Sequence, residues 1–179
     1  MMRSNKFLEN AMDYEKKIAN NLENILTITE GDNPSDWTKA IYKSLSLSKL
    51  NEQNSKIACS RLSEEEKDCG EWLYDYVEYE ENNDSNSLKN IILVAESEWQ
   101  HYRQENYFSD LKFDFEKLLV AKSDYRLFVF ENNTMDEVKE NIEKLKEIIK
   151  NFDKKQIGER FLFAGWIKSK KFYFDLFVV

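Results

Sequence analysis

The sequence "NIILVAESEW", residues 90–99, contains the segment on which the predicted fold depends. Five apolar residues, Ile91 to Ala95, follow one another without interruption, which is typical of a strand buried on both faces. Because alternate residues of a strand share a face, Glu96 and Glu98 point to the same side of the sheet. The segment therefore predicts a central strand that ends with two carboxylates on one face.

The composition is that of a folded domain without a membrane span. The chain has 179 residues, of which 41% are hydrophobic and 14% aromatic, with 4 Gly and 1 Pro. We expect a single domain over residues 1–179, since a chain of this length can bury a sizeable core. The sequence has no signal-peptide pattern and no apolar stretch near the roughly 20 residues that cross a bilayer. Its two cysteines, Cys59 and Cys69, suit a reducing compartment, so we expect a cytoplasmic protein with no membrane partner.

Helical and strand patterns divide the chain into three parts. Residues 1–50 predict N-terminal helices, the first over residues 5–27. Residues 55–131 predict a core of three strands, a helix and a fourth strand. Residues 134–179 predict a helix and a C-terminal β-hairpin. This order predicts an α/β (α+β) fold with a mixed central sheet flanked by helices.

A third carboxylate, Asp75, interrupts the apolar alternation of the strand predicted over residues 71–80. If this strand lies beside the strand of residues 90–99, Asp75 converges with Glu96 and Glu98. Ionised carboxylates that crowd on a half-buried face are costly. A divalent cation removes that cost, and Mg²⁺ takes one or two carboxylates while keeping several waters. The sequence therefore predicts a metal site at the exit of the central strand.

Three segments together resemble the PD-(D/E)XK nuclease superfamily, which has the restriction-endonuclease-like fold. They are "EWLYDYVEYE", "NIILVAESEW" and "DFEKLLVAKSDYRLFVFE", and they lie within residues 71–131. The shared pattern is an Asp on one strand, an acidic tripeptide ending the next, then a helix with a Lys and another strand. Small uncharacterised bacterial members of the superfamily have a similar combination. The resemblance implies Mg²⁺- or Mn²⁺-dependent hydrolysis of phosphodiester bonds, with nucleic acid, and DNA in particular, as the partner.

The resemblance also assigns roles by motif position. Asp75 and Glu96 match the metal ligands of the superfamily. Glu98 stands where a Lys is usual, although some restriction enzymes have Glu there, and the residue before Asp75 is not the usual proline. Some members supply the Lys from the next helix, which makes Lys117 the candidate here and Lys122 its rival. Glu98 and Lys117 are thus the expected catalytic groups.

Charge leaves two other functions open. The net charge of −8 disfavours non-specific attraction to phosphates, and Glu98 in the Lys position is compatible with a nuclease fold that has lost its activity. Residues 64–84 contain ten acidic residues and one Lys, so an acidic interaction or inhibitor domain is a further alternative. In residues 138–171 basic residues outnumber acidic ones, and the range includes the predicted hairpin turn "KSKK" (168–171). The apolar end "LFVV" (176–179) is a candidate contact of a homodimer.

Overall fold

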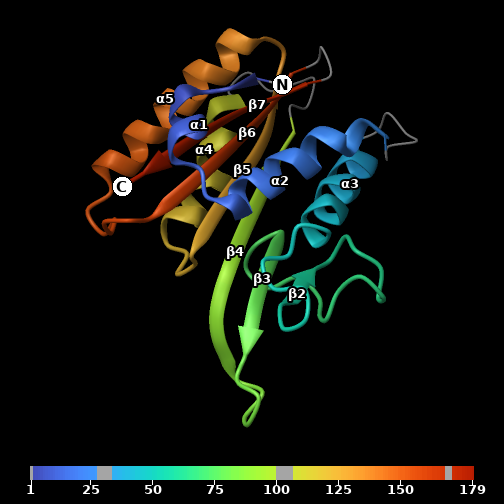
Figure 1. The fold of residues 1–179 in the computed structure, drawn as a ribbon. Coiled ribbons are helices and arrows are strands. Elements are labelled where there is room, and N and C mark those ends of the chain that lie inside the picture. The colour runs from blue at the N-terminus through green and yellow to red at the C-terminus, as the bar shows by residue number, and fades with distance from the viewer. Residues whose placement is uncertain (1, 28–33, 100–106, 168–170) are drawn as a thin grey trace.

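The protein is a mixed α/β structure with one seven-stranded sheet and helices on both of its faces (Figure 1). The computed structural model describes residues 2–27, 34–99, 107–167 and 171–179. The strands are β1 (Met2–Arg3), β2 (Lys56–Cys59), β3 (Tyr76–Glu81), β4 (Leu88–Glu98), β5 (Tyr125–Asn132), β6 (Arg160–Ile167) and β7 (Lys171–Val178). The helices are α1 (Asn5–Asn10), α2 (Asp13–Glu23), the 3₁₀ turn η1 (Asn24–Thr27), α3 (Pro34–Ser46), α4 (Tyr107–Leu119) and α5 (Met135–Asn151). The predicted α/β class with a mixed sheet is therefore confirmed.

Strand pairing changes direction across the sheet, whose order is β1-β7-β6-β5-β4-β3-β2. Strands β2, β3 and β4 form an antiparallel meander. Strands β4, β5 and β6 are parallel, with α4 and α5 in the two connections. Strand β7 returns antiparallel to β6, which gives the predicted C-terminal hairpin, although residues 168–170 of its basic turn lie outside the described residues. Because β3 and β4 are antiparallel, the start of β3 meets the end of β4.

The sheet separates two apolar layers. Helices α1, α2 and α3 cover one face, and α4 and α5 cover the other (Figure 1). Leu93 belongs to the first cluster and Val94 to the second, and both side chains are buried. The prediction that β4 is buried on both faces is confirmed. No helix within the described ranges has the length and apolar character that crossing a membrane requires.

The prediction of one helix over residues 5–27 is wrong. The chain is extended at Ala11 and Met12, and α2 starts at Asp13. The carboxylate of Glu15 accepts a hydrogen bond from the backbone N–H of Met12 and forms a bidentate ion pair with Arg160, at 2.9 and 2.6 Å. A partner 145 residues away in sequence thus helps to fix the helix start, and helical periodicity does not reveal it.

The strand predicted over residues 71–80 is shorter than expected, because β3 begins at Tyr76. Strand β2 ends at Cys59, which pairs with Tyr76, so the preceding residues have no partner on that side. On the other side, the Asp75 side chain accepts the hydrogen bond of the Ser97 N–H at 3.0 Å. Leu73, which a strand over residues 71–80 would place on the same face as Asp75, is 81% exposed.

The apolar end "LFVV", predicted as a dimer contact, mainly belongs to the core. Leu176 is buried among the side chains of the first cluster, whereas Phe177 and Val179 pack against the second. Strand β7 pairs with β6 along its whole length, from Lys171 to Val178, so the segment is held in the sheet. Of its four residues, Val178 is the most exposed, at 39%.

Candidate active site

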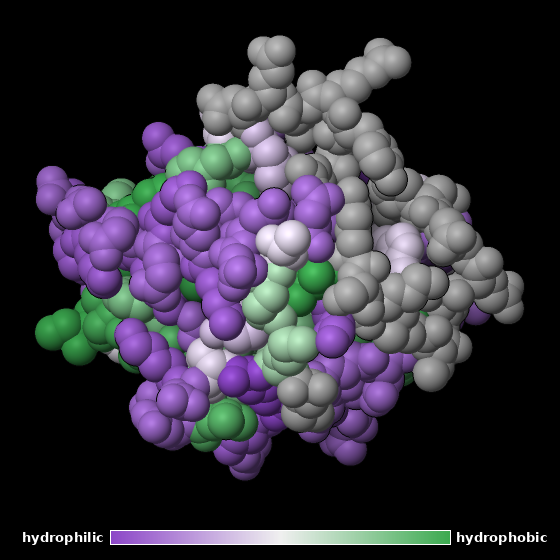
Figure 2. Space-filling model, turned by 90° about the horizontal axis from the view of Figure 1, so that it is seen from above, coloured by the Kyte–Doolittle hydropathy of each residue, from purple (hydrophilic) through white to green (hydrophobic). Residues whose placement is uncertain are grey.

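A pocket of about 330 Å³ lies where β4 ends. It is lined by Ser35, Thr38, Tyr42, Arg61, Asp75, Glu96, Ser97, Glu98, Trp99, Asp114 and Lys117. Four of the five residues singled out from the sequence are among them. In Figure 1 this end of β4 is uppermost, and Figure 2 views the molecule from that side. Hydrophilic residues cover much of the described surface in that view (Figure 2).

Asp75 is held at the mouth of the pocket by α3 and β4. The hydroxyl of Tyr42 donates to its Oδ2 atom at 2.6 Å, and the Ser97 N–H donates to the same oxygen at 3.0 Å. The Ser97 hydroxyl lies 3.3 Å from that oxygen and 2.7 Å from the Tyr42 hydroxyl. Burial, followed by the charge of Asp75, raises the pKa of Tyr42 well above its usual value, so Tyr42 remains a donor. These contacts fix one carboxylate oxygen and leave Oδ1 without a partner among the described residues.

Glu96 is the most buried acid of the pocket, at 1% exposure. The Lys117 Nζ atom donates to its Oε2 atom at 3.0 Å and also lies 2.8 Å from Asp114. The other carboxylate oxygen, Oε1, is buried and has no hydrogen-bond partner within the described part of the chain. Burial raises the pKa of Glu96 to about 8, and the charge of Asp75 acts in the same direction, whereas Lys117 lowers it. Glu96 is thus an acid with one oxygen free to take a proton or a cation.

Glu98 lies beside a fourth carboxylate, Asp114 of α4. Burial raises the pKa of Glu98 to about 8, and a hydrogen bond with the Asp114 side chain adds to this effect. Burial lowers the pKa of Lys117, but its hydrogen bonds to Asp114 and Glu96 outweigh that effect and leave the pKa above the usual range. Lys117 therefore stays protonated in a pocket where two acids, Glu96 and Glu98, retain their protons to unusually high pH.

Lys122 lies apart from the carboxylates. Helix α4 ends at Leu119, so Lys122 is not on the apolar stripe where the sequence placed it. It is exposed and lines a different pocket. Since α4 stops before this residue, only Lys117 of the two candidate lysines reaches Glu96.

The sequence did not single out seven of the eleven lining residues, and four of these seven bear on the chemistry of the site: Tyr42, Arg61, Ser97 and Asp114. Asp114 precedes Lys117 by three residues on a helix, a spacing that places both on one face and was visible in the sequence. Tyr42 and Ser97 carried no such signal, since their role depends on how α3 packs on the sheet. Arg61 is the second cation of the pocket, and its guanidinium forms no ion pair or hydrogen bond with the described side chains.

The donor set fits some metals and not others. Nowhere in the described ranges are three or more His, Cys, Asp or Glu side chains arranged to enclose a metal ion. Zinc sites use three or four protein ligands, mostly His and Cys, so the pocket does not fit zinc. Mg²⁺ and Mn²⁺ prefer oxygen, and Mg²⁺ needs one or two carboxylates because it keeps its waters. Asp75 and Glu96, the latter with its unpartnered Oε1 atom, fit that requirement.

Comparisons with protein-family models, with curated proteins and with solved structures gave no match to this chain.

Proposed function

We propose that the protein hydrolyses phosphodiester bonds of nucleic acid, with DNA as the favoured substrate, in a reaction that depends on Mg²⁺ or Mn²⁺. The observation that carries the proposal is the buried, unpartnered Oε1 atom of Glu96 in a pocket with three further carboxylates. A buried acceptor without a partner is costly and calls for an explanation. A cation shared with Asp75 supplies one.

The order of elements supports the same proposal. The antiparallel β2-β3-β4 meander is followed by α4 and by β5 parallel to β4. The chain order of strand, strand, helix and strand matches the pattern on which the resemblance to the PD-(D/E)XK superfamily rests. Glu96 lies on β4 and Lys117 on α4, as the resemblance expects, whereas Asp75 directly precedes β3 instead of lying on it.

The side chains suit separate roles in hydrolysis. Asp75 and Glu96 would hold the cation, which when bound polarises the phosphate and acidifies a water. Lys117, kept protonated by Asp114 and Glu96, can stabilise negative charge that develops on the phosphate. Glu98, with its pKa of about 8, can accept a proton from the attacking water once it is ionised, so its action as a base is favoured above about pH 8.

The Lys117–Glu96 ion pair favours a second candidate function. In this arrangement the ammonium group already neutralises one oxygen of Glu96 at 3.0 Å. A nuclease fold that had lost its activity could keep such a pair as a structural contact and act only through binding. Metal affinity separates the two functions, because a purely structural pair has no need of a cation.

The acidic-surface alternative has less support. Several acids of residues 64–84 are engaged within the protein. Glu78 accepts from Tyr14 and from the Leu50 N–H, Asp68 accepts from the Ile57 N–H, and Glu80 and Glu81 pair with lysines. Residues 64–84 therefore do not present a uniform acidic face to a partner.

A cleavage assay tests the proposal. Supercoiled plasmid, linear duplex, single-stranded DNA and RNA are incubated with the protein in Mg²⁺ or Mn²⁺, with EDTA as the metal-free control. We expect metal-dependent cutting of DNA that Glu96→Gln and Asp75→Asn abolish. Glu147→Gln is the matched control, because Glu147 is an exposed acid of α5 outside the pocket.

Two results contradict the proposal. One is cutting that persists unchanged in Glu96→Gln, which places the activity elsewhere or in a contaminant. The other is the absence of metal-dependent cutting of every substrate together with no Mn²⁺ binding by calorimetry. Metal binding without cutting would retain the metal site and favour the non-catalytic function.

A further inference from the structure

A second pocket, larger than the carboxylate pocket and sharing no lining residue with it, has a volume of about 830 Å³. Small-molecule sites span roughly 300 to 1,000 Å³. Its walls come from the Met12 region before α2, from the end of α4 through the start of β5, and from the α5–β6 connection. It therefore opens at the amino-terminal ends of the parallel strands β5 and β6.

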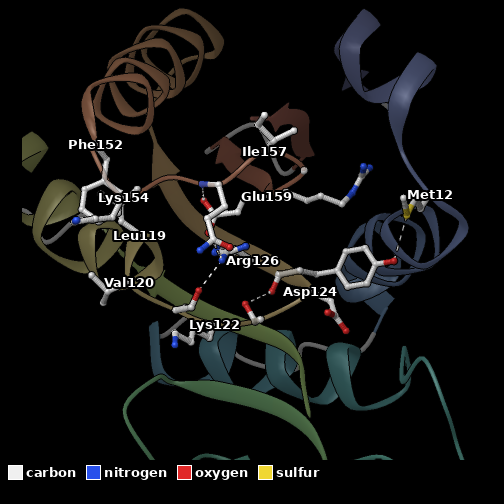
Figure 3. A pocket seen from close by; sticks show the side chains of 16 residues that line it. Met12, Leu119, Val120, Lys122, Asp124, Arg126, Phe152, Lys154, Ile157 and Glu159 are labelled. Atoms are coloured by element: carbon white, nitrogen blue, oxygen red, sulfur yellow. Dashed lines mark hydrogen bonds and ion pairs between the residues drawn. The ribbon is translucent and has the colours of Figure 1, made fainter. Parts of the chain in front are cut away.

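The floor of this pocket is Arg126, which is only 3% exposed (Figure 3). Its Nε atom donates to the Leu118 carbonyl at 3.1 Å. Its Nη2 atom donates to the Ala121 carbonyl at 2.6 Å and to Glu159 at 2.8 Å. The third nitrogen, Nη1, is buried and has no partner within the described residues. The buried guanidinium thus retains N–H groups without hydrogen-bond acceptors, and a buried donor without an acceptor lowers the stability of a protein.

The charges around Arg126 leave an excess of positive charge. Glu159 is engaged by Arg126 and by the Gln156 N–H at 3.0 Å, and Asp124 accepts from Asn90 at 2.7 Å. Lys122 and Lys154 also line the pocket, and both are exposed without an ion pair to any described residue. Although the whole chain has a net charge of −8, the side chains that line this pocket give it a local positive charge, which attracts anions.

Apolar side chains complete the pocket. In Figure 3 Leu119, Val120 and Phe152 lie on one side of Arg126, Met12 lies on the opposite side, and Ile157 lies above. Val120 is 67% exposed and Ile157 is 98% exposed. Exposed apolar side chains around a buried cation suit a ligand with an anionic group and an apolar body.

We propose that this pocket binds a small organic anion, whose phosphate or carboxylate group faces Arg126, Lys122 and Lys154 while its apolar body lies against Val120, Phe152 and Ile157. The binding is independent of hydrolysis at the carboxylate pocket. Phosphate esters and carboxylates share the chemistry that Arg recognises, namely two oxygens that accept from a planar fork of donors.

Calorimetric titration tests this proposal with four probes: phenyl phosphate, benzoate, inorganic phosphate and the neutral benzyl alcohol. We expect saturable binding of phenyl phosphate or benzoate, weaker binding of inorganic phosphate, and none of benzyl alcohol. Tighter binding of phenyl phosphate identifies a phosphate ester as the ligand class, and tighter binding of benzoate identifies a carboxylate.

Two surface variants locate the site without disturbing the core. Lys154→Glu should weaken every anion about tenfold or more, and Ile157→Asp should weaken phenyl phosphate and benzoate more than inorganic phosphate. Lys6→Glu and Leu73→Asp are the matched controls, since both residues are exposed and lie outside the pocket. Melting curves confirm that each variant folds.

The proposal is overturned if neither organic anion binds the wild-type protein at millimolar concentration. It is also overturned if binding is equal in Lys154→Glu, Ile157→Asp and their controls, or if benzyl alcohol binds as tightly as benzoate. Loss of binding in the two pocket variants alone supports it.

Discussion

The Nζ atom of Lys117 lies 3.0 Å from the Oε2 atom of Glu96. The Lys117 side chain is partly exposed, whereas the Glu96 side chain is buried. The pair joins the middle of the sheet to α4 and leaves the second oxygen of Glu96 inside the pocket.

Removing Lys117 should reduce cleavage strongly. We expect Lys117→Ala to lower the cleavage rate by roughly 100-fold, because it removes the cation nearest to Glu96. Lys122→Ala is the control, since Lys122 lines the other pocket. Rates are compared under single-turnover conditions at saturating Mg²⁺. Equal losses in the two variants would contradict the assignment of Lys117 to the site.

Glu96 should make the metal-free protein less stable as the pH rises. Its pKa is about 8 in the folded protein, above the ordinary value of 4.5, so the folded state binds more protons than the unfolded state between these values. The contribution of Glu96 to stability is complete below about pH 4.5 and is lost as the pH rises to about 8, with a slope of at most about 1.4 kcal/mol per pH unit. Glu96→Gln should remove this slope. Urea unfolding in EDTA from pH 5 to 9 measures it, and parallel curves for both proteins would refute the prediction.

Tyr42 should position Asp75 for the cation. Tyr42→Phe removes a hydrogen bond to a carboxylate, which costs about 1.5 to 3 kcal/mol of stability. We expect the Mg²⁺ concentration for half-maximal cleavage to rise several-fold. Tyr14→Phe is the matched control, because Tyr14 is also a buried donor to an acid, Glu78, but lies outside the pocket. A similar change in the Mg²⁺ requirement of both variants would show that only stability is affected.

Gly165 should not tolerate a methyl group. A Cβ atom at this position of β6 would lie 2.3 Å from the Cγ1 atom of Val138 on α5. We expect Gly165→Ala to cost about 1 to 3 kcal/mol in the free energy of unfolding, and a second change, Val138→Ala, to restore part of it. Gly70→Ala is the control, since no neighbouring atom lies within 4 Å of the position that its methyl group would take. Equal stability of the two glycine variants would disprove the close contact.

The ion pair between Lys146 and Asp175 should be the most sensitive polar contact of the core. Both side chains are buried, and the pair joins α5 to β7. Lys146→Met leaves Asp175 buried without its cation, which costs about 3 to 5 kcal/mol. Lys150→Met, on the same helix with an exposed partner, should cost less than about 1 kcal/mol. The double variant Lys146→Met/Asp175→Leu should recover much of the loss in urea unfolding, and failure to do so would argue against an electrostatic origin.

Local patterns predicted the elements whose signals lie within one segment. The uninterrupted apolar run of β4 and the capping box of Thr134 and Glu137 at α5 fall in this class. The break between α1 and α2 does not, because the contact of Glu15 with Arg160 of β6 helps to fix it. Strand order likewise depends on packing that no single segment reveals.

The residues of the candidate site were likewise predicted only where a local pattern indicated them. Acid spacing on β4 indicated Glu96 and Glu98, and the structure brings them together with Asp75 and Lys117. The reason given for Asp75 was incomplete, because its position depends on hydrogen bonds from Tyr42 and Ser97 and not on an extended strand. Tyr42 lies on α3 and Ser97 on β4, and the two residues come close to each other only in the folded chain.

The buried charge of Asp175 on β7 also bears on aggregation. Strand β1 pairs with β7 only opposite Tyr173 and Phe174, so the rest of that outer edge has no neighbouring strand among the described residues. An open edge invites pairing with a strand of another molecule, and an inward-facing charge disfavours such pairing. The Asp175 carboxylate, which Lys146 and Ser4 hold inward, accepts the Leu176 N–H at 2.8 Å and so occupies one donor of this edge. We expect this arrangement to keep concentrated solutions free of fibrils even though the C-terminal strand is strongly apolar.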